Sequence, residues 1–222
     1  MGVLYNSRIV TDGLVLCLDA GDKMSYPGAG TTWTDLSKNR NNGTLTNGPT
    51  FDSANGGSIV FDGTNDSVRS IDFDVDYISI FAWFKPTNFS HYREIASKWS
   101  NTGNGNSYSL LTDITTGKIR WWVSSGSATV NNNGQLVAGE WNNVCATYDG
   151  VNSKTYHNGD FVAQVVKSGP LNNSNSVVCV GNRDGGNSYP MLGNIALVQI
   201  YNRALTPDEI RQNYNATRGR FQ

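Results

Sequence analysis

The chain has 222 residues and a formal net charge of −1, and no cluster of basic residues interrupts it, so a nucleic-acid-binding surface is not expected. Charged residues make up 16% of the sequence, glycine contributes 24 residues, and asparagine is more numerous still. This composition is typical of many turns joining uncharged strands. A chain of this length can fold as a single all-β domain with a sizeable core.

The N-terminal sequence, the absence of long apolar runs and the cysteines suggest where the protein is made. The sequence "MGVLYNSRIVTDG" lacks the charged-then-apolar layout of a signal peptide, and no apolar run approaches the roughly 18 residues of a membrane helix. Cys17, Cys145 and Cys179 each lie in an apolar run, which predicts buried free thiols and a reducing compartment. We expect a cytoplasmic product with no membrane association. Residues 1–11 are interpreted as an arm or edge strand and residues 12–222 as one domain.

Strand-like runs recur along the chain with turn residues between them. They are "GLVLCLDAGD", "GGSIVFDGTND", "DYISIFAWFKP", "KIRWWVSS", "WNNVCATYDG", "KTYHNGDFVAQVV", "SVVCVGNR" and "NIALVQIYN". In the third run, Phe81 and Trp83 alternate with a second apolar set, which predicts a central strand covered on both faces. Asn158-Gly159 in the sixth run predicts a tight hairpin. Because no helical period separates the runs, an antiparallel two-sheet sandwich is expected.

The segment "LTPDEI" carries the start signals of a helix. Thr206 is expected as the N-cap, Pro207 as the first helical residue and Glu209 as the third, which together form a capping box. A short helix over about 207–217 should follow and pack Ile210 and Tyr214 on the sheet that the chain has just left.

Several motifs in order resemble the laminin-G-like, concanavalin A-like jelly-roll family. They are "WTDLSKNRNNGTL", "IVFDGTND", "ISIFAWFKP", "WNNVCATYDG", "YHNGDFV" and "GNRDGGNSYPMLGNIALVQIYNRAL", followed by the capped helix. The resemblance covers about residues 12–217. It implies an all-β fold of two packed antiparallel jelly-roll sheets, with carbohydrate or protein binding on a sheet face or at edge loops. It does not imply one activity, because the fold serves lectins, glycan hydrolases and structural modules.

Catalysis is not expected. Related glucanases carry Glu-x-Asp-x-Glu along one strand, and this spacing is absent from a chain with only three glutamates. The stretch "DFDVD" does place Asp72, Asp74 and Asp76 on alternate positions. A polar loop entering the next strand is the favoured interpretation, with a cation site and a catalytic site as the alternatives.

Calcium is a candidate ligand at two loops, since relatives in the resembled family hold one near the edge of the sandwich. The candidate ligands are Asp35 and Asn39 in one loop, and Asp62, Asn65 and Asp66 in the other. The strand before "IYNRAL" lacks the acidic residue found in many relatives, which weakens the metal prediction. The alternative for the second loop is a turn built on Asx hydrogen bonds.

Two loops offer aromatic rings beside amide or charged groups, the combination that sugars need. One patch would comprise Trp99, Asn101, Asn106 and Tyr108; the other would comprise Arg183, Asp184, Asn187 and Tyr189. The alternative is that Trp99 and Tyr108 are core or rim aromatics. Trp121 and Trp122 should point to opposite faces of one strand, with one in the core.

Modules that look like this one occur on tailed bacteriophage particles, whose proteins need no signal peptide because lysis releases them. The leading hypothesis is therefore a noncatalytic protein of the virion surface, a capsid decoration or fibre part, that binds neighbouring virion proteins, host glycans or both. A calcium-dependent lectin is second and a hydrolase third. Homo-oligomerisation is left open.

Overall fold

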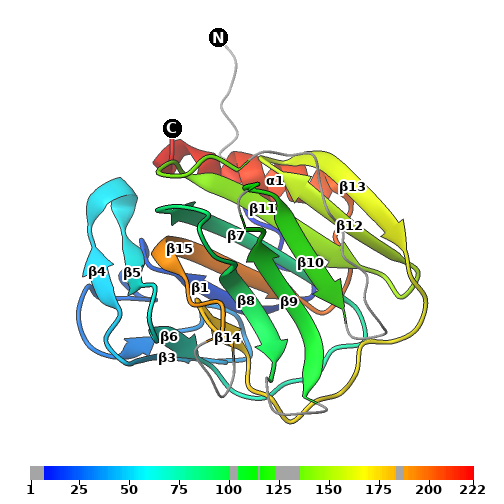
Figure 1. Ribbon diagram of the computed structural model, residues 1–222, viewed down its shortest axis with the longest axis horizontal. Helices are drawn as coiled ribbons and strands as arrows, with labels where there is room; N and C mark the ends of the chain where they lie inside the picture. The colour runs from blue at the N-terminus through cyan, green and yellow to red at the C-terminus, as the bar shows by residue number, and fades with distance from the viewer. Residues whose placement is uncertain (1–7, 101–104, 115, 124–135, 184–187) are drawn as a thin grey trace.

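The molecule consists of two antiparallel sheets packed face to face. The structure is a computed structural model, and it describes residues 8–100, 105–114, 116–123, 136–183 and 188–222. Figure 1 shows the two layers, with helix α1 (Pro207–Thr217) at the top beside the C-terminus. The expected all-β jelly-roll sandwich with a short C-terminal helix is confirmed.

The first sheet has eight strands. In spatial order they are β13 (Asp160–Val166), β12 (Asn152–His157), β11 (Asn142–Tyr148), β7 (Ile78–Pro86), β15 (Leu192–Tyr201), β5 (Ser58–Asp62) and β4 (Thr50–Asp52), with β1 (Leu14–Asp19) also paired to β15. The second sheet has seven strands. They are β10 (Ile119–Val123), β9 (Asn106–Thr112), β8 (Arg93–Trp99), β14 (Cys179–Val180), β6 (Ser67–Arg69), β3 (Gly43–Thr46) and β2 (Thr32–Trp33). Two short 3-10 turns, η1 (Ala54–Gly56) and η2 (Arg218–Arg220), complete the elements.

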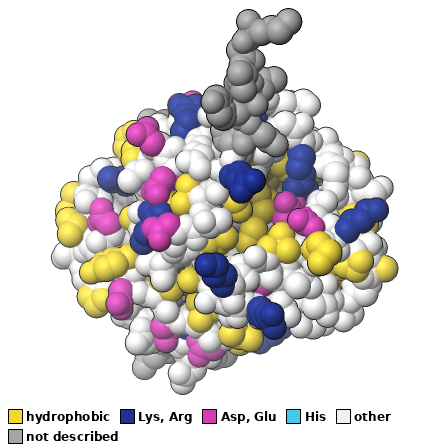
Figure 2. Space-filling model, turned by 180° about the vertical axis from the view of Figure 1, so that it is seen from behind, with side chains coloured by type: hydrophobic (Ala, Val, Ile, Leu, Met, Phe, Trp, Pro, Cys, Tyr) yellow, Lys and Arg dark blue, Asp and Glu magenta, His cyan; other side chains and the backbone are white. Residues whose placement is uncertain are grey.

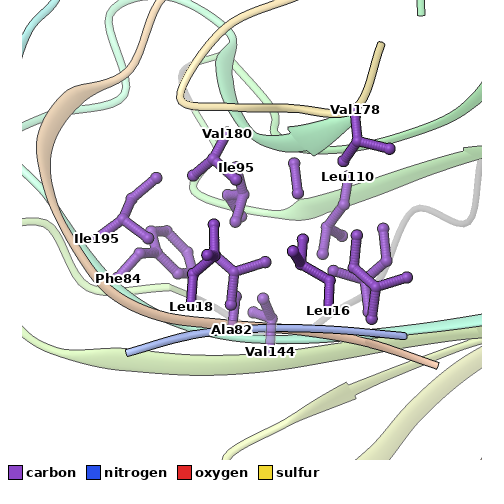
Figure 3. Close-up of a cluster of buried hydrophobic side chains, with 14 of the residues drawn as sticks. Leu16, Leu18, Ala82, Phe84, Ile95, Leu110, Val144, Val178, Val180 and Ile195 are labelled. Atoms are coloured by element: carbon purple, nitrogen blue, oxygen red, sulfur yellow. The ribbon is translucent and has the colours of Figure 1, made fainter. Parts of the chain in front are cut away.

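The main core fills the space between the two sheets. Figure 3 shows Leu16, Leu18, Phe84 and Val144 of the eight-stranded sheet pointing toward the other layer, where Ile95 and its neighbours meet them. Alternate residues of each strand supply this layer, as the two-residue period of a strand requires.

β7 is the central strand that its sequence predicts. Ile80, Ala82 and Phe84 face the core between the sheets, while Phe81 and Trp83 belong to a second cluster beneath α1. Every residue from Ile78 to Phe84 is buried, because one face is covered by the other sheet and the opposite face by the helix.

Helix α1 begins where the capping signals predict and spans the predicted residues. Thr206 accepts a hydrogen bond from the Glu209 backbone N–H, and the Glu209 carboxylate accepts one from the Thr206 N–H at 2.8 Å. Ile210 and Tyr214 are buried against the eight-stranded sheet, as expected. The predicted hairpin also forms: Asn158 and Gly159, with φ of 51° and 81°, connect β12 to β13.

The N-terminal arm and the cysteines are the remaining fold predictions. Residues 1–7 lie outside the described part, and residues 8–11 form no strand but pack on the last strand and α1, where the Val10 N–H donates to Asn213 Oδ1 at 2.8 Å. All three cysteines are buried and free, as predicted. No helix among the described residues is long and apolar enough to cross a membrane. On the side shown in Figure 2, acidic and basic side chains are interspersed and do not gather by sign.

Candidate functional site

The outer face of the seven-stranded sheet carries a set of aromatic rings around one arginine. The Arg183 guanidinium carbon lies 5.1 Å from the ring centroid of Trp99, 5.0 Å from Trp122 and 4.5 Å from Tyr189. Tyr92 packs edge to face on Tyr189, with centroids 4.9 Å apart. We call Tyr92, Trp99, Trp122 and Tyr189 the aromatic face. Each of these four residues is half-buried, so each keeps part of its surface in contact with solvent.

Strand register explains why Trp122 belongs to this face and Trp121 does not. Trp121 is paired with Leu110 and is fully buried in the core, whereas Trp122 is paired with Ser109, whose buried hydroxyl contacts Arg183 under the aromatic face. The prediction that the two tryptophans point to opposite faces is confirmed. Trp99, at the end of β8, packs on Trp122 across β9 with ring centroids 5.7 Å apart.

Glu94 lies beneath the arginine and fixes its position. Its Oε2 accepts a hydrogen bond from Arg183 Nε at 2.8 Å, and its Oε1 accepts one from Ser109 Oγ at 2.6 Å. Arg183 Nη2 donates to the same Ser109 oxygen at 3.0 Å. Glu94 is fully buried, and burial raises its pKa to about 7 against the opposing influence of Arg183 and Ser109. The guanidinium is therefore held in one orientation between the rings.

Tyr189 is fixed by its backbone as well as by its ring. It has a φ of 63°, in the left-handed region that a bulky residue seldom adopts. Its carbonyl accepts a hydrogen bond from the Glu94 N–H at 2.8 Å, which joins this loop to β8. Strained conformations of this kind persist where the surroundings hold them, and they occur often at ligand sites.

Comparison with known proteins places the chain in a family. Residues 61–211 match a laminin-G-type family model described as the concanavalin A-like lectin/glucanases superfamily. The chain belongs to this superfamily. No curated protein sequence matches it significantly.

Solved structures share the fold of this superfamily member at low sequence identity. Domain 4 of AbnA, a GH43 extracellular arabinanase from Geobacillus stearothermophilus in complex with arabinotriose, is 17% identical with a TM-score of 0.72, over 92% of this chain and 100% of that domain. Trypanosoma rangeli sialidase in complex with the inhibitor DANA is 16% identical with a TM-score of 0.70, over 93% of this chain and 33% of the sialidase. The binding domain of Paraclostridial Mosquitocidal Protein 1 is 14% identical with a TM-score of 0.72, over 92% of this chain and 52% of that one. The concanavalin A-like fold is thus shown, and structures that share it include binding domains.

The concanavalin A-like fold brings the two predicted sugar patches together in part. Trp99, Arg183 and Tyr189 were assigned to separate loops and lie in one cluster. The prediction that Tyr108 belongs to a sugar patch is wrong. Its side chain is fully buried in the core beside Trp121 and cannot present a ring to a ligand. Asn106 is half-buried opposite Trp99 on the neighbouring strand. The remaining predicted residues, Asn101, Asp184 and Asn187, lie outside the described residues.

Three contributors to the site were missed in the sequence or left undecided. Tyr92 was not singled out, Trp121 and Trp122 were not told apart, and Glu94 entered only as one of the three glutamates whose spacing does not match the glucanase motif.

The first predicted calcium loop is closed by hydrogen bonds. Oδ1 of Asp35 accepts from the backbone N–H groups of Cys17 and Ser37 at 2.7 and 2.8 Å. Its Oδ2 accepts from Ser37 Oγ at 2.6 Å and from the Asn41 N–H at 2.8 Å. The carboxylate thus organises this loop of the domain. Asn39 is exposed, and its amide nitrogen donates to the Leu14 carbonyl at 3.3 Å.

The second calcium loop has the geometry of the Asx-turn alternative. Asp62 Oδ1 accepts from the Thr64 N–H at 2.7 Å, and Asp66 Oδ2 accepts from the Asp62 N–H at 3.0 Å. The Asn65 carbonyl accepts from the Asn47 amide at 2.9 Å. Burial raises the pKa of Asp66, which disfavours the charged form that calcium needs. Within the described ranges, no three His, Cys, Asp or Glu residues group as metal ligands. Calcium binding stays a prediction.

The "DFDVD" stretch forms the polar loop that was favoured. It contains no strand, and the ammonium of Lys98 pairs with both Asp72 and Asp74. Lys98 also donates to the Phe73 carbonyl at 3.1 Å, and its side chain is fully buried. The carboxylates of Asp72 and Asp74 are therefore paired with a lysine of β8.

Proposed function

We propose that the protein is a noncatalytic carbohydrate-binding module and that the aromatic face is its binding surface. The observation that carries the proposal is the cluster of half-buried aromatic residues held around Arg183. The faces of pyranose rings are apolar, so flat aromatic rings match them, and Arg183, which is 5% exposed, fixes the arrangement of these rings from between them. Because Glu94 and the strands hold these groups in place, little conformational entropy is lost when a ligand binds.

A noncatalytic role is supported by the positions of two of the three glutamates, Glu94 and Glu209. Glycoside hydrolysis requires two carboxyl groups on either side of the scissile bond, roughly 5–9.5 Å apart. Glu94 is fully buried beneath Arg183 and is not exposed to a ligand on the aromatic face. Glu209 belongs to the cap of α1, on the side of the other sheet. Neither glutamate is placed to protonate or attack a glycosidic bond at the rings.

For the biological setting we propose the surface of a bacteriophage particle, as a capsid decoration or fibre component. Two observations support it. The three buried free thiols fit folding in a reducing cytoplasm. The low content of charged residues fits a surface packed by neighbouring proteins. Mass spectrometry of purified particles from the source should detect the protein at structural copy number, and its absence from all particles would contradict this setting.

A glycan array tests the carbohydrate proposal. The purified protein, Trp122→Ala and Phe161→Ala are compared, each with calcium and with a chelator. Phe161 is a matched control because it is an aromatic residue, 57% exposed, on β13 of the other sheet. We expect selective binding that Trp122→Ala weakens at least about ten-fold and that Phe161→Ala leaves unchanged.

The comparison with and without calcium decides whether carbohydrate binding depends on the metal. Binding that is lost with the chelator would support the calcium-dependent lectin, and binding that survives would remove the metal from the account. No binding to any glycan in either condition would contradict the proposed function and would favour assembly with proteins.

A further inference from the structure

A depression of about 650 Å³ lies beside the aromatic face, at one end of the sandwich. Its walls include Tyr92 and Tyr189, so it shares two rings with the aromatic face. Thr64, Arg93 and Pro190 also line it, and we call this depression the rim pocket. A ligand that extends along the aromatic face past Tyr189 would enter the rim pocket next.

Arg93 places a positive charge in the wall of the rim pocket. It is the first residue of β8 and is 3% exposed. Its Nη1 donates to the Pro190 carbonyl at 3.0 Å, and its Nη2 donates to Asn88 Oδ1 and Ser90 Oγ at 3.2 and 3.4 Å. All three acceptors are neutral. Nε is buried and has no hydrogen-bond acceptor among the described residues.

The charge of Arg93 has no counter-ion in the part of the chain that the structure describes. None of the ion pairs found there includes Arg93, and none of the described residues that line the rim pocket is Asp or Glu. Burial lowers the pKa of Arg93, and the guanidinium nevertheless stays charged, because an arginine does not lose its proton in proteins. Arg183 differs, since the carboxyl group of Glu94 lies 2.8 Å from its Nε and supplies an acidic partner.

We infer that the rim pocket binds an anionic group of a sugar, a carboxylate or a sulfate ester, so that the ligand of the aromatic face is an acidic oligosaccharide. This inference rests on the proposed function and narrows its ligand class. A buried cation that lacks an acidic partner is costly, and an anionic ligand would supply that partner in a partly desolvated setting. The rings of Tyr92 and Tyr189 would pack against the sugar that carries the charge.

The test uses oligosaccharides that differ only in charge. Uronic acid trimers, sulfated trimers and their neutral parents of the same linkage are titrated by calorimetry into the full chain at low and high NaCl. Two variants of Thr64 are matched in size and differ in charge: Thr64→Glu and Thr64→Gln. Thr64 is exposed, and the backbone N–H that it donates to Asp62 is kept in both variants.

We expect the charged trimers to bind more tightly than their neutral parents and to weaken as salt rises. Thr64→Glu should weaken the charged trimers at least about five-fold by placing a negative charge in the pocket wall, while Thr64→Gln stays within about two-fold of the wild type. Arg93→Gln should abolish the preference for charged over neutral trimers. If circular dichroism shows that this variant does not fold, the Thr64 pair still decides.

Each outcome bears on the inference separately from the proposed function. Neutral trimers that bind as tightly as charged ones, with equal affinities in both Thr64 variants but a loss in Trp122→Ala, would overturn the anionic ligand and keep the carbohydrate-binding face. Absence of binding to all trimers would overturn both. Preference for uronic acids over sulfated sugars would identify the carboxylate as the group bound, and the reverse would identify the sulfate ester.

Discussion

The outer faces of the two sheets both carry a tryptophan, but the two side chains differ in how far they are buried. Trp83 on the eight-stranded sheet is 2% exposed, stacked on Tyr214 and Phe221 with centroids 5.7 and 4.3 Å away, and its Nε1 donates to Thr217 Oγ1 at 2.8 Å. Trp122 on the seven-stranded sheet is half-buried and packs on Trp99 and Arg183. The C-terminal helix thus converts one face into core, while the other keeps its rings accessible. Aromatic residues of one type stabilise the fold on one side and are available to a ligand on the other.

The largest effect on stability should come from the covered face. Trp83→Ala removes a buried ring between the sheet and α1 and should lower the free energy of unfolding by about 3–5 kcal/mol. Urea denaturation followed by circular dichroism measures it. A loss below 1 kcal/mol would mean that the helix contributes little to this face.

Glu94 should give the stability of the protein a characteristic pH dependence. Its pKa is raised from 4.5 to about 7 in the folded state, so between these pH values the folded chain holds more protons than the unfolded chain. The contribution of Glu94 is therefore fully present below pH 4.5 and is lost as pH rises to 7, with a slope of at most about 1.4 kcal/mol per pH unit.

Comparison of the wild type with Glu94→Gln over pH 4.5 to 7.5 isolates this slope, because glutamine does not titrate. The destabilisation caused by the variant should shrink as pH rises through this window. A difference that grows with pH would show that Arg183 lowers the pKa of Glu94 instead of leaving it raised.

The cap of α1 should contribute a smaller amount. Thr206→Ala removes the acceptor for the Glu209 N–H and should cost about 1 kcal/mol, whereas Thr206→Ser retains the oxygen and should cost only a few tenths. Thermal unfolding of the two variants provides the comparison. Equal losses would indicate that the methyl group, not the hydrogen bond, matters.

The smallest effect on stability should come from the accessible face. Trp122→Ala should lower the free energy of unfolding by less than about 1 kcal/mol if its ring serves a ligand more than the core. A loss as large as that of Trp83→Ala would remove the distinction between the two faces. The same denaturation experiment measures both variants.

Local signals in the sequence predicted the fold well. The capping box placed the start of α1 at Pro207, and Asn158-Gly159 placed the β12–β13 turn, because both structures depend on neighbouring residues. The sequence "NSYSLLT" also predicts the position of Tyr108, which was missed. In a strand, Tyr108 and Leu110 point to the same face and Ser109 points to the opposite one. Tyr108 therefore points into the core with Leu110.

The candidate site could be predicted only in parts. Trp99 and Arg183 were each identified, but their meeting depends on β14 pairing with β8, a contact between distant segments that no local pattern fixes. The ion pair of Glu94 with Arg183 has the same origin. The hydrogen bonds that close the Asp35 loop also come partly from distant segments, since one of the donors, Cys17, lies in β1.

The central claim is that ligand binds on the aromatic face, and the six tryptophans allow a direct test. Their indole N–H signals are resolved by two-dimensional NMR, assigned with single Trp→Phe variants, and followed during titration with the oligosaccharide that gives the strongest array signal. The account predicts that the signals of Trp99 and Trp122 shift while those of Trp33 and Trp83 stay in place. Shifts confined to Trp141, or binding that moves neither Trp99 nor Trp122, would contradict it.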